Sequence, residues 1–272
     1  MSLRGDLLDL VKRTEVLLRR TVIPDRFHRV EIETNSRCNR ACGYCPVSVA
    51  PRPAHEMPEA LFLSILDQLA AMDFRGRLSP HFFGEPLLDA RLPRLVAEAR
   101  RRLPHARVVI YTNGDALTPA KARALLDAGV SLFIVTFEHG ESEAFRRTRA
   151  ALPWWTLRRR FWVRHFDADV KAPYNRGGTV RFDRELHQES CHAPSSVLVI
   201  DAWGRVKLCP NDYEGREDWG DLATTPLAEL WHRPDYRHTR RALLRGHFEK
   251  EICRTCTGRA TMPGDVPWPT AS

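Results

Sequence analysis

The chain has 272 residues, of which 43% are hydrophobic and 28% charged, and this suits one large globular domain or one domain with a small appendage. No apolar run approaches the roughly 20 residues that cross a bilayer, and charged side chains interrupt the apolar stretch near the N-terminus, which argues against a secretory signal. We therefore expect a cytoplasmic protein without membrane contact. The net charge of +8 does not by itself indicate nucleic acid, because the arginines are spread along the chain, and we expect no nucleic-acid partner.

Strand and helix patterns alternate along most of the chain. After a first helix within residues 1–27, alternating or apolar runs predict strands at 30–34, 78–83, 108–111, 130–137, 161–166 and 179–182. Helical spacing of apolar residues predicts helices at 57–73, 92–103 and 118–128, the last ended by Gly129. Such alternation predicts an α/β fold with a parallel sheet, whose functional groups lie on the loops that follow the strands.

Seven cysteines lie at positions 38, 42, 45, 191, 209, 253 and 256. An odd number in a reducing compartment favours metal or redox chemistry over a disulfide framework. The first three (Cys38, Cys42 and Cys45, the cysteine trio) follow the strand at 30–34 with the spacing C-x-x-x-C-x-x-C. Three thiolates on one loop can hold three irons of a [4Fe-4S] cluster and leave the fourth iron open. A zinc loop is a poorer fit, because zinc prefers four ligands and neither His28 nor His55 is well spaced for it.

The strand, the trio with Tyr44 before its last cysteine, and Pro46 resemble the signature of the radical S-adenosylmethionine (SAM) superfamily. The resemblance implies a partial (β/α)6 TIM-like barrel over residues 28–185, with the cluster near the end of its first strand. It also implies that SAM binds the open iron and that one-electron reduction releases a 5′-deoxyadenosyl radical. Tyr44 matches the aromatic position that the family uses near adenine.

Residues at later strand ends resemble the family's SAM-binding positions. Gly84-Glu85-Pro86 is similar to the GGEP motif, whose Glu and neighbouring backbone hold the SAM amino group, although Phe83 replaces the first glycine. Asn113, Thr136 and Arg164 fall near the ends of the strands that follow. There the resemblance implies polar contacts to SAM, whereas each residue taken alone would suit a strand cap.

The remaining four cysteines (Cys191, Cys209, Cys253 and Cys256, the cysteine quartet) lie around a predicted hairpin, 197–200 and 205–208, and a predicted helix at 226–244. Four thiols suit a structural zinc. Their order and spacing, however, resemble the twitch appendage of radical SAM enzymes, a shortened SPASM domain that binds an auxiliary [4Fe-4S] cluster. The resemblance thus implies two [4Fe-4S] clusters, a twitch domain over 186–260 and a tail over 261–272.

An auxiliary cluster with four protein ligands has no open iron, so its useful role is electron transfer. A substrate radical at a carbinol carbon that loses the hydroxyl proton and one electron becomes a ketone. This chemistry needs a proton acceptor close to the hydroxyl. We expect it among Arg176, Tyr174 and His165, with Arg176 first.

The twitch-only architecture resembles that of dehydrogenases that oxidise aminocyclitols in aminoglycoside pathways. We therefore predict an oxidoreductase for a secondary alcohol of a carbohydrate or aminocyclitol, served by an electron donor such as flavodoxin or ferredoxin. Sugar epimerisation, decarboxylation and peptide maturation are the alternatives. Epimerisation with a cysteine hydrogen donor is disfavoured, because all seven cysteines are assigned to clusters. Peptide maturation is disfavoured because the stretch before Arg29 is short for a peptide-recognition domain.

Overall fold

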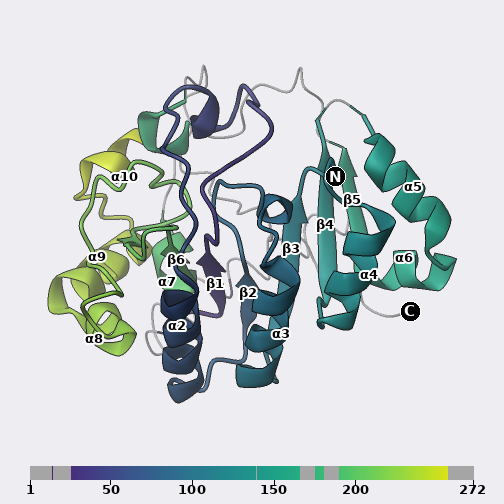
Figure 1. The fold of residues 1–272 in the computed structure, drawn as a ribbon. Helices are drawn as coiled ribbons and strands as arrows, with labels where there is room; N and C mark the ends of the chain where they lie inside the picture. Colours follow the sequence, from purple (N-terminus) through teal and green to yellow (C-terminus); the bar gives the residue numbers. More distant parts are fainter. Residues whose placement is uncertain (1–13, 15–25, 139, 166–174, 181–189, 257–272) are drawn as a thin grey trace.

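The computed structural model describes residues 14, 26–138, 140–165, 175–180 and 190–256, arranged as one α/β fold around an open sheet (Figure 1). Most of the helix expected within 1–27, the tail at 261–272 and Tyr174 lie outside the described residues. None of the helices in the described part of the chain is long and apolar enough to cross a membrane.

The described strands form one seven-stranded sheet in the order β5-β4-β3-β2-β1-β6-β7. They are β1 (Arg29–Ile32), β2 (Arg77–Ser79), β3 (Arg107–Thr112), β4 (Leu132–Phe137), β5 (Phe161–His165), β6 (Val197–Ile200) and β7 (Val206–Lys207). Every pairing among β1 to β6 is parallel, and only β7 is antiparallel, to β6. The carboxyl ends of six strands therefore meet at one edge of the sheet, which is where α/β folds carry their sites.

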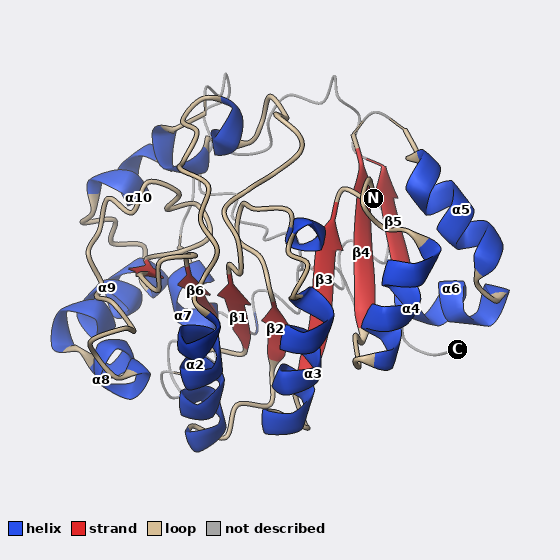
Figure 2. Cartoon of the chain, viewed as in Figure 1, coloured by secondary structure: helices blue, strands red, loops and turns tan. Residues whose placement is uncertain are grey.

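Helices cover the outer face of this sheet (Figure 2). They are α2 (Glu59–Ala71), α3 (Leu92–Arg102), α4 (Pro119–Asp127), α5 (Glu143–Ala151) and α6 (Trp154–Arg160). All of them except α6 bury apolar side chains against the sheet. In α2, for example, Phe62, Ile65 and Leu66 face the core and are at most 1% exposed. Burying such a side chain stabilises the fold by about 1.5–3 kcal/mol. The outer face is thereby sealed, and the polar residues of the inner face are left to line a cavity.

The C-terminal region packs against the start of the sheet. It contains η3 (Arg176–Gly178), α7 (Ala193–Ser196), α8 (Leu227–His232), α9 (Pro234–Leu244) and α10 (Glu251–Thr255). Trp231 of α8 meets Phe27 edge-on, with ring centroids 4.7 Å apart, and the Leu227 backbone N–H donates to the Gln68 side chain on α2 at 2.6 Å. The predicted hairpin is confirmed, and its turn uses Gly204 at φ 91°, where a side chain would be strained.

Three sequence predictions are corrected by the structure. The strand expected at 78–83 ends at Ser79, and the following residues turn inward as a loop. Thr179 and Val180 form a turn and not a strand, while 181–182 lie outside the described residues; the parallel place beside β1 is taken by β6. The helix expected at 226–244 is broken at Arg233, because Pro234 has no N–H for an intrahelical bond and its ring clashes with the preceding turn.

Candidate active site

The cysteine trio lies on the loop that leaves the carboxyl end of β1. The loop closes on itself through the Cys45 N–H, which donates to the Cys42 carbonyl at 2.8 Å, and Pro46 then begins the 3-10 helix η1 (Pro46–Ser48). All three thiols are half-buried. Burial foremost, and then the nearby Glu138 carboxylate, raise the pKa of Cys42 to about 11, and burial raises the pKa of Cys38 and Cys45 as well. Metal binding at this loop must therefore displace thiol protons.

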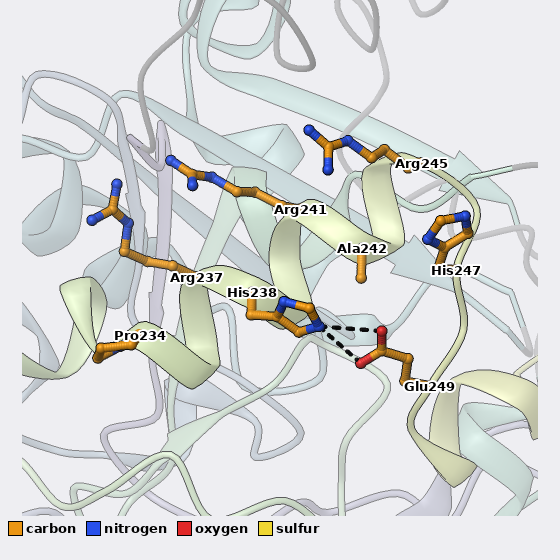
Figure 3. A pocket seen from close by; sticks show the side chains of 8 residues that line it. All are labelled: Pro234, Arg237, His238, Arg241, Ala242, Arg245, His247 and Glu249. Carbon is orange, nitrogen blue, oxygen red and sulfur yellow. Dashed lines mark hydrogen bonds and ion pairs between the residues drawn. The ribbon is translucent and has the colours of Figure 1, made fainter.

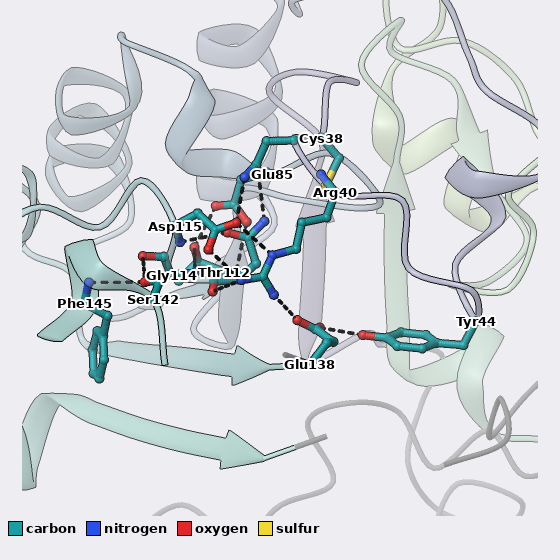
Figure 4. A network of polar contacts seen from close by, with 12 residues as sticks. Cys38, Arg40, Tyr44, Glu85, Thr112, Gly114, Asp115, Glu138, Ser142 and Phe145 are labelled. Carbon is teal, nitrogen blue, oxygen red and sulfur yellow. Dashed lines mark hydrogen bonds and ion pairs between the residues drawn. The ribbon is translucent and has the colours of Figure 1, made fainter. Parts of the chain in front are cut away.

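An ionic network fixes the trio loop to the ends of β3 and β4 (Figure 4). The Arg40 guanidinium donates to both carboxylate oxygens of Asp115, at 2.7 and 2.5 Å, and also pairs with Glu138. The Tyr44 hydroxyl donates to the other Glu138 oxygen at 2.5 Å. Burial and this hydrogen bond raise the pKa of Tyr44, so the phenol stays neutral. The network holds Tyr44, the predicted adenine-side residue, in the wall of the site.

The Gly84-Glu85-Pro86 turn is packed too tightly to tolerate changes. A Cβ on Gly84 would lie 1.9 Å from the Asn35 carbonyl oxygen, so only glycine fits. The Glu85 carboxylate accepts from the Thr112 hydroxyl at 2.7 Å and from the Asn113 N–H at 2.9 Å. Burial raises the pKa of Glu85 to about 7. Glu85 therefore fixes the carboxyl end of β3 through these two hydrogen bonds. Pro86 begins the short helix η2 (Pro86–Leu88) and does not line the cavity.

A cavity of about 200 Å³ opens beside these elements. The trio, Tyr44 and the Gly84-Glu85 turn line one side, and Asn113, Thr136 and Arg164 line the sheet side. Arg164 donates to the Thr136 hydroxyl at 3.0 Å. The sequence-predicted SAM residues are thus gathered around one space, Pro86 excepted.

The C-terminal region also contributes to the cavity lining. Arg176 and Pro210 line it there, and the Arg176 guanidinium lies over the Phe83 ring at 5.5 Å. Arg176 also donates to the Asn211 side-chain oxygen at 3.2 Å. Phe83, which stands in place of the first glycine of GGEP, thus forms an aromatic wall, packing edge-on against Tyr213 with ring centroids 4.8 Å apart.

The lining residues that sequence reasoning missed include Glu31, His81 and Tyr111. The His81 and Tyr111 rings stack at 4.6 Å. Burial, and then the Arg77 and Arg164 charges, lower the pKa of His81 to about 3, so its imidazole is neutral. Burial raises the pKa of Glu31. In the sequence Glu31 alternates with apolar residues, as on a solvent-facing side of a strand, and its burial is visible only in the structure.

Two predicted proton acceptors are not placed in the cavity. His165, at the end of β5, is exposed; it contacts the Phe137 ring and does not line the cavity. Tyr174 lies outside the described residues. Arg176 is the predicted acceptor that the structure brings to the site.

The cysteine quartet comes from three segments of the C-terminal region. Cys209 follows β7, Cys253 and Cys256 belong to α10 and its end, and the Cys191 N–H donates to the Leu243 carbonyl of α9 at 2.9 Å. All four thiols are half-buried, and none of the seven cysteines forms a disulfide. Burial, and then the neighbouring quartet thiols, raise the pKa of Cys253 to about 12. Among the described residues no three His, Cys, Asp or Glu groups converge closely enough to hold a single ion.

Comparison with known proteins assigns both regions. Residues 32–163 match the family model of the radical SAM superfamily, and residues 191–257 match that of an iron–sulfur cluster-binding domain, SPASM. An S-adenosyl-L-methionine-dependent 2-deoxy-scyllo-inosamine dehydrogenase from Niallia circulans is 35% identical over 234 residues, covering 85% of this chain and 92% of that protein. The chain belongs to the radical SAM superfamily.

Two further likenesses refine the radical SAM assignment. The crystal structure of BtrN in complex with AdoMet and 2-DOIA matches with a TM-score of 0.77 and 34% identity, covering 85% of this chain and 93% of that one. A PqqA peptide cyclase from Xanthomonas campestris pv. campestris (strain B100) is 45% identical over 200 residues, which cover 70% of this chain but only 48% of the cyclase. The likeness to the dehydrogenase thus spans nearly a whole protein, and the likeness to the cyclase about half of one.

Proposed function

We propose that this radical SAM enzyme oxidises a secondary alcohol of an aminocyclitol, or of a closely related carbohydrate, to a ketone. Support comes first from the inosamine dehydrogenase, which resembles the chain over 92% of its length. It comes also from BtrN, whose complex with AdoMet and 2-DOIA shares the fold with a TM-score of 0.77.

The two groups of thiols suit two [4Fe-4S] clusters. The trio offers three ligands on one loop, and its remaining side faces the cavity where SAM would lie. The quartet offers four free thiols, one for each iron of a four-iron cluster. When bound, the trio cluster with SAM supplies a radical that abstracts hydrogen, and the quartet cluster supplies an acceptor for one electron.

One observation carries the assignment to oxidation: the cavity connects the trio with the quartet. Cys38, Cys42 and Cys45 line it together with Pro210, which is adjacent to Cys209 in the sequence. Asn211 links the cavity to the quartet, because its oxygen accepts from Arg176 and its amide nitrogen lies 3.6 Å from the Cys256 sulfur. A substrate in this cavity would therefore lie beside the trio and close to the segment that carries Cys209.

The cavity residues supply what the alcohol needs. In place of the proton acceptor predicted from the sequence, a binding role suits Arg176: a guanidinium stays protonated in proteins, so it can hold the hydroxyl oxygen and stabilise negative charge that develops on it. Glu31, whose carboxyl group interacts with the Arg176 charge, lines the same cavity and can receive the proton. Neutral His81 and Tyr111 offer hydrogen bonds to the other hydroxyls of a polyol.

Anaerobic reconstitution followed by turnover with 2-deoxy-scyllo-inosamine tests this proposal. We expect about eight irons per chain, two clusters of four, and one ketone formed per SAM consumed. A substrate deuterated at the carbinol carbon should transfer its label to 5′-deoxyadenosine. About four irons with one zinc would overturn the two-cluster assignment, and a redox-neutral product would overturn oxidation.

A further inference from the structure

A second hollow of about 400 Å³ lies on the surface of the C-terminal region and shares no residue with the active-site cavity (Figure 3). It is formed by α9 and the segment that follows it. Its lining residues are Pro234, Arg237, His238, Arg241, Ala242, Arg245, His247 and Glu249. We call it the α9 groove.

The α9 groove is strongly basic. Arg237 and Arg241 are four residues apart and lie on one face of α9, and Arg245 follows at its C-cap; all three line the groove. Their guanidinium groups extend in a row from this face in Figure 3. One carboxylate, Glu249, lines the groove, and it is engaged by His238 at 3.2 Å. The groove thus presents a row of three cations, and the partner that fits it is anionic.

The α9 groove is tied directly to the segments that carry the quartet. The Leu243 carbonyl, between Arg241 and Arg245 in the sequence, accepts the Cys191 N–H at 2.9 Å. Glu249 is followed four residues later by Cys253, and its carbonyl oxygen accepts from the side chain of Arg254. Cys191 is therefore hydrogen-bonded to the helix that forms the groove, and Cys253 lies four residues after Glu249 of its lining.

We propose that the α9 groove is the docking surface for an acidic protein that carries one electron, a flavodoxin or ferredoxin, at the quartet end of the molecule. This inference rests on the proposed function, and its electron balance requires such a partner. In each turnover one electron enters to cleave SAM, and the substrate radical releases one electron and one proton as the C=O bond forms. That electron leaves through the quartet, and the docked carrier takes it up and becomes reduced by one electron.

Charge reversal on the groove tests the proposal, with bacterial flavodoxin as the probe and the enzyme carrying its clusters. The variant R237E/R241E/R245E changes the charge by −6. The matched control is R146E/R147E/R149E on α5, three exposed arginines at the opposite end of the sheet, with the same change in net charge. The first readout is the dissociation constant for flavodoxin at two salt concentrations. The second is the rate of electron transfer from reduced enzyme to oxidised flavodoxin, compared with transfer to a neutral quinone.

We expect the α9 variant to bind flavodoxin about 10- to 100-fold more weakly and with less salt dependence, because steering by a charged surface is of this order. Transfer to flavodoxin should slow by a similar factor, and transfer to the quinone should stay unchanged. The α5 control should change binding less than about threefold. Equal losses in both variants, or no loss in the α9 variant, would overturn the assignment of this surface.

A neutral variant guards against misfolding, since acidic residues at 241 and 245, in the last turn and at the C-cap of α9, oppose the helix dipole. R237Q/R241Q/R245Q removes the charges without adding repulsion, and we expect a loss of about tenfold in flavodoxin affinity. Unchanged affinity in this variant would also contradict the proposal. Failure of the proposed function has a different signature: no ketone from wild-type enzyme driven by dithionite, a small reductant that needs no docking surface, whatever the affinity for flavodoxin.

Discussion

The two groups of thiols are built in opposite ways. The trio lies on one continuous loop, held to the strand ends by charged side chains: Arg40, Asp115, Glu138 and Tyr44. The quartet comes from segments up to 65 positions apart, 191 to 256, held by backbone hydrogen bonds. One such bond joins Asp212 to the Cys209 carbonyl at 3.0 Å, and another joins Cys256 to the Ile252 carbonyl at 3.0 Å.

This difference matches two kinds of chemistry. The trio faces the cavity, and its ionic frame offers polar groups to a polar ligand. The quartet thiols are half-buried like those of the trio, but they do not line the cavity, which reaches this region at Pro210. A charged frame beside the cavity suits binding and reaction, whereas a backbone-bonded group of thiols set back from it suits electron transfer.

Removing one cysteine from each group is the strongest test of the different roles proposed for the trio and the quartet. Cys42→Ala should abolish SAM cleavage and ketone formation together, by more than about 10³-fold, because the trio has no spare ligand. Cys253→Ala should also abolish ketone formation but leave SAM cleavage measurable, since only the electron acceptor is lost. Quantifying 5′-deoxyadenosine and ketone in the same reaction separates the two outcomes. Normal ketone yield from Cys253→Ala would show that the quartet takes no electron.

Arg52 joins the two regions and carries the next largest expected effect. Its guanidinium pairs at 2.6 Å with Glu33, which is fully buried, and lies over the Tyr213 ring at 4.6 Å. The Tyr213 hydroxyl in turn donates to the Ala50 carbonyl at 2.7 Å. Arg52→Ala would leave a buried carboxylate without its cation, and we expect a loss of about 3–5 kcal/mol in the free energy of unfolding.

The control for this prediction is Arg52→Lys, which keeps the charge but loses the planar group over Tyr213. Measured by urea titration for both variants, Arg52→Lys should lose less than half of the free energy of unfolding that Arg52→Ala loses. Equal losses in Arg52→Ala and Arg52→Lys would assign the stability to ring contacts and not to the ion pair.

Local pattern predicted the trio side well and the quartet side less well. The trio, Gly84 and Asn113 follow strands and Arg164 is near the end of one, so strand periodicity placed them at one edge. By contrast, the parallel pairing of β6 with β1 joins residues about 170 positions apart, and no local pattern encodes it. The domain boundaries at 185 and 260 stay predictions. Glu138, Asp115 and His81 were missed because a single polar residue after a strand looks like an ordinary cap. The break at Pro234 was readable from the sequence.

Glu85, a buried carboxyl group close to the trio loop, should also make the free energy of unfolding depend on pH. Burial raises the pKa of Glu85 to about 7 from its ordinary value of 4.5. The folded state therefore holds the Glu85 proton more tightly than the unfolded state. The contribution of Glu85 to the free energy of unfolding is fully present below pH 4.5 and is lost as the pH rises to 7. The fall is about 3 kcal/mol for a shift of this size. Glu85→Gln should remove this part of the pH dependence, measured as the difference between variant and wild type in urea unfolding. A constant difference from pH 4.5 to 8 would contradict it.

The smallest expected effect concerns the trio loop and the residue before it. Two arginines there, Arg40 and Arg37, form ion pairs that differ in burial. Arg40 is 14% exposed and pairs with Glu138, which is 8% exposed, whereas Arg37 and its partner Glu56 are both more than 40% exposed. Exposed pairs contribute at most about 1 kcal/mol because water screens them. Arg40→Ala leaves the carboxylates of Asp115 and Glu138 without their cation beside the thiols. We expect a loss of about 2 kcal/mol in the free energy of unfolding.

The two substitutions also separate stability from ligand binding. Arg40→Ala should weaken SAM binding about tenfold, since Glu138 then no longer holds Tyr44 in place and about 1.4 kcal/mol corresponds to that factor. Arg37→Ala should leave SAM affinity within about twofold, because its only carboxylate partner among the described residues lies on the exposed side of the loop. Isothermal titration of each reconstituted variant with SAM measures both. If Arg37→Ala weakened SAM binding as much as Arg40→Ala, the loop would depend on its total charge, and the buried network would not be the element that shapes the site.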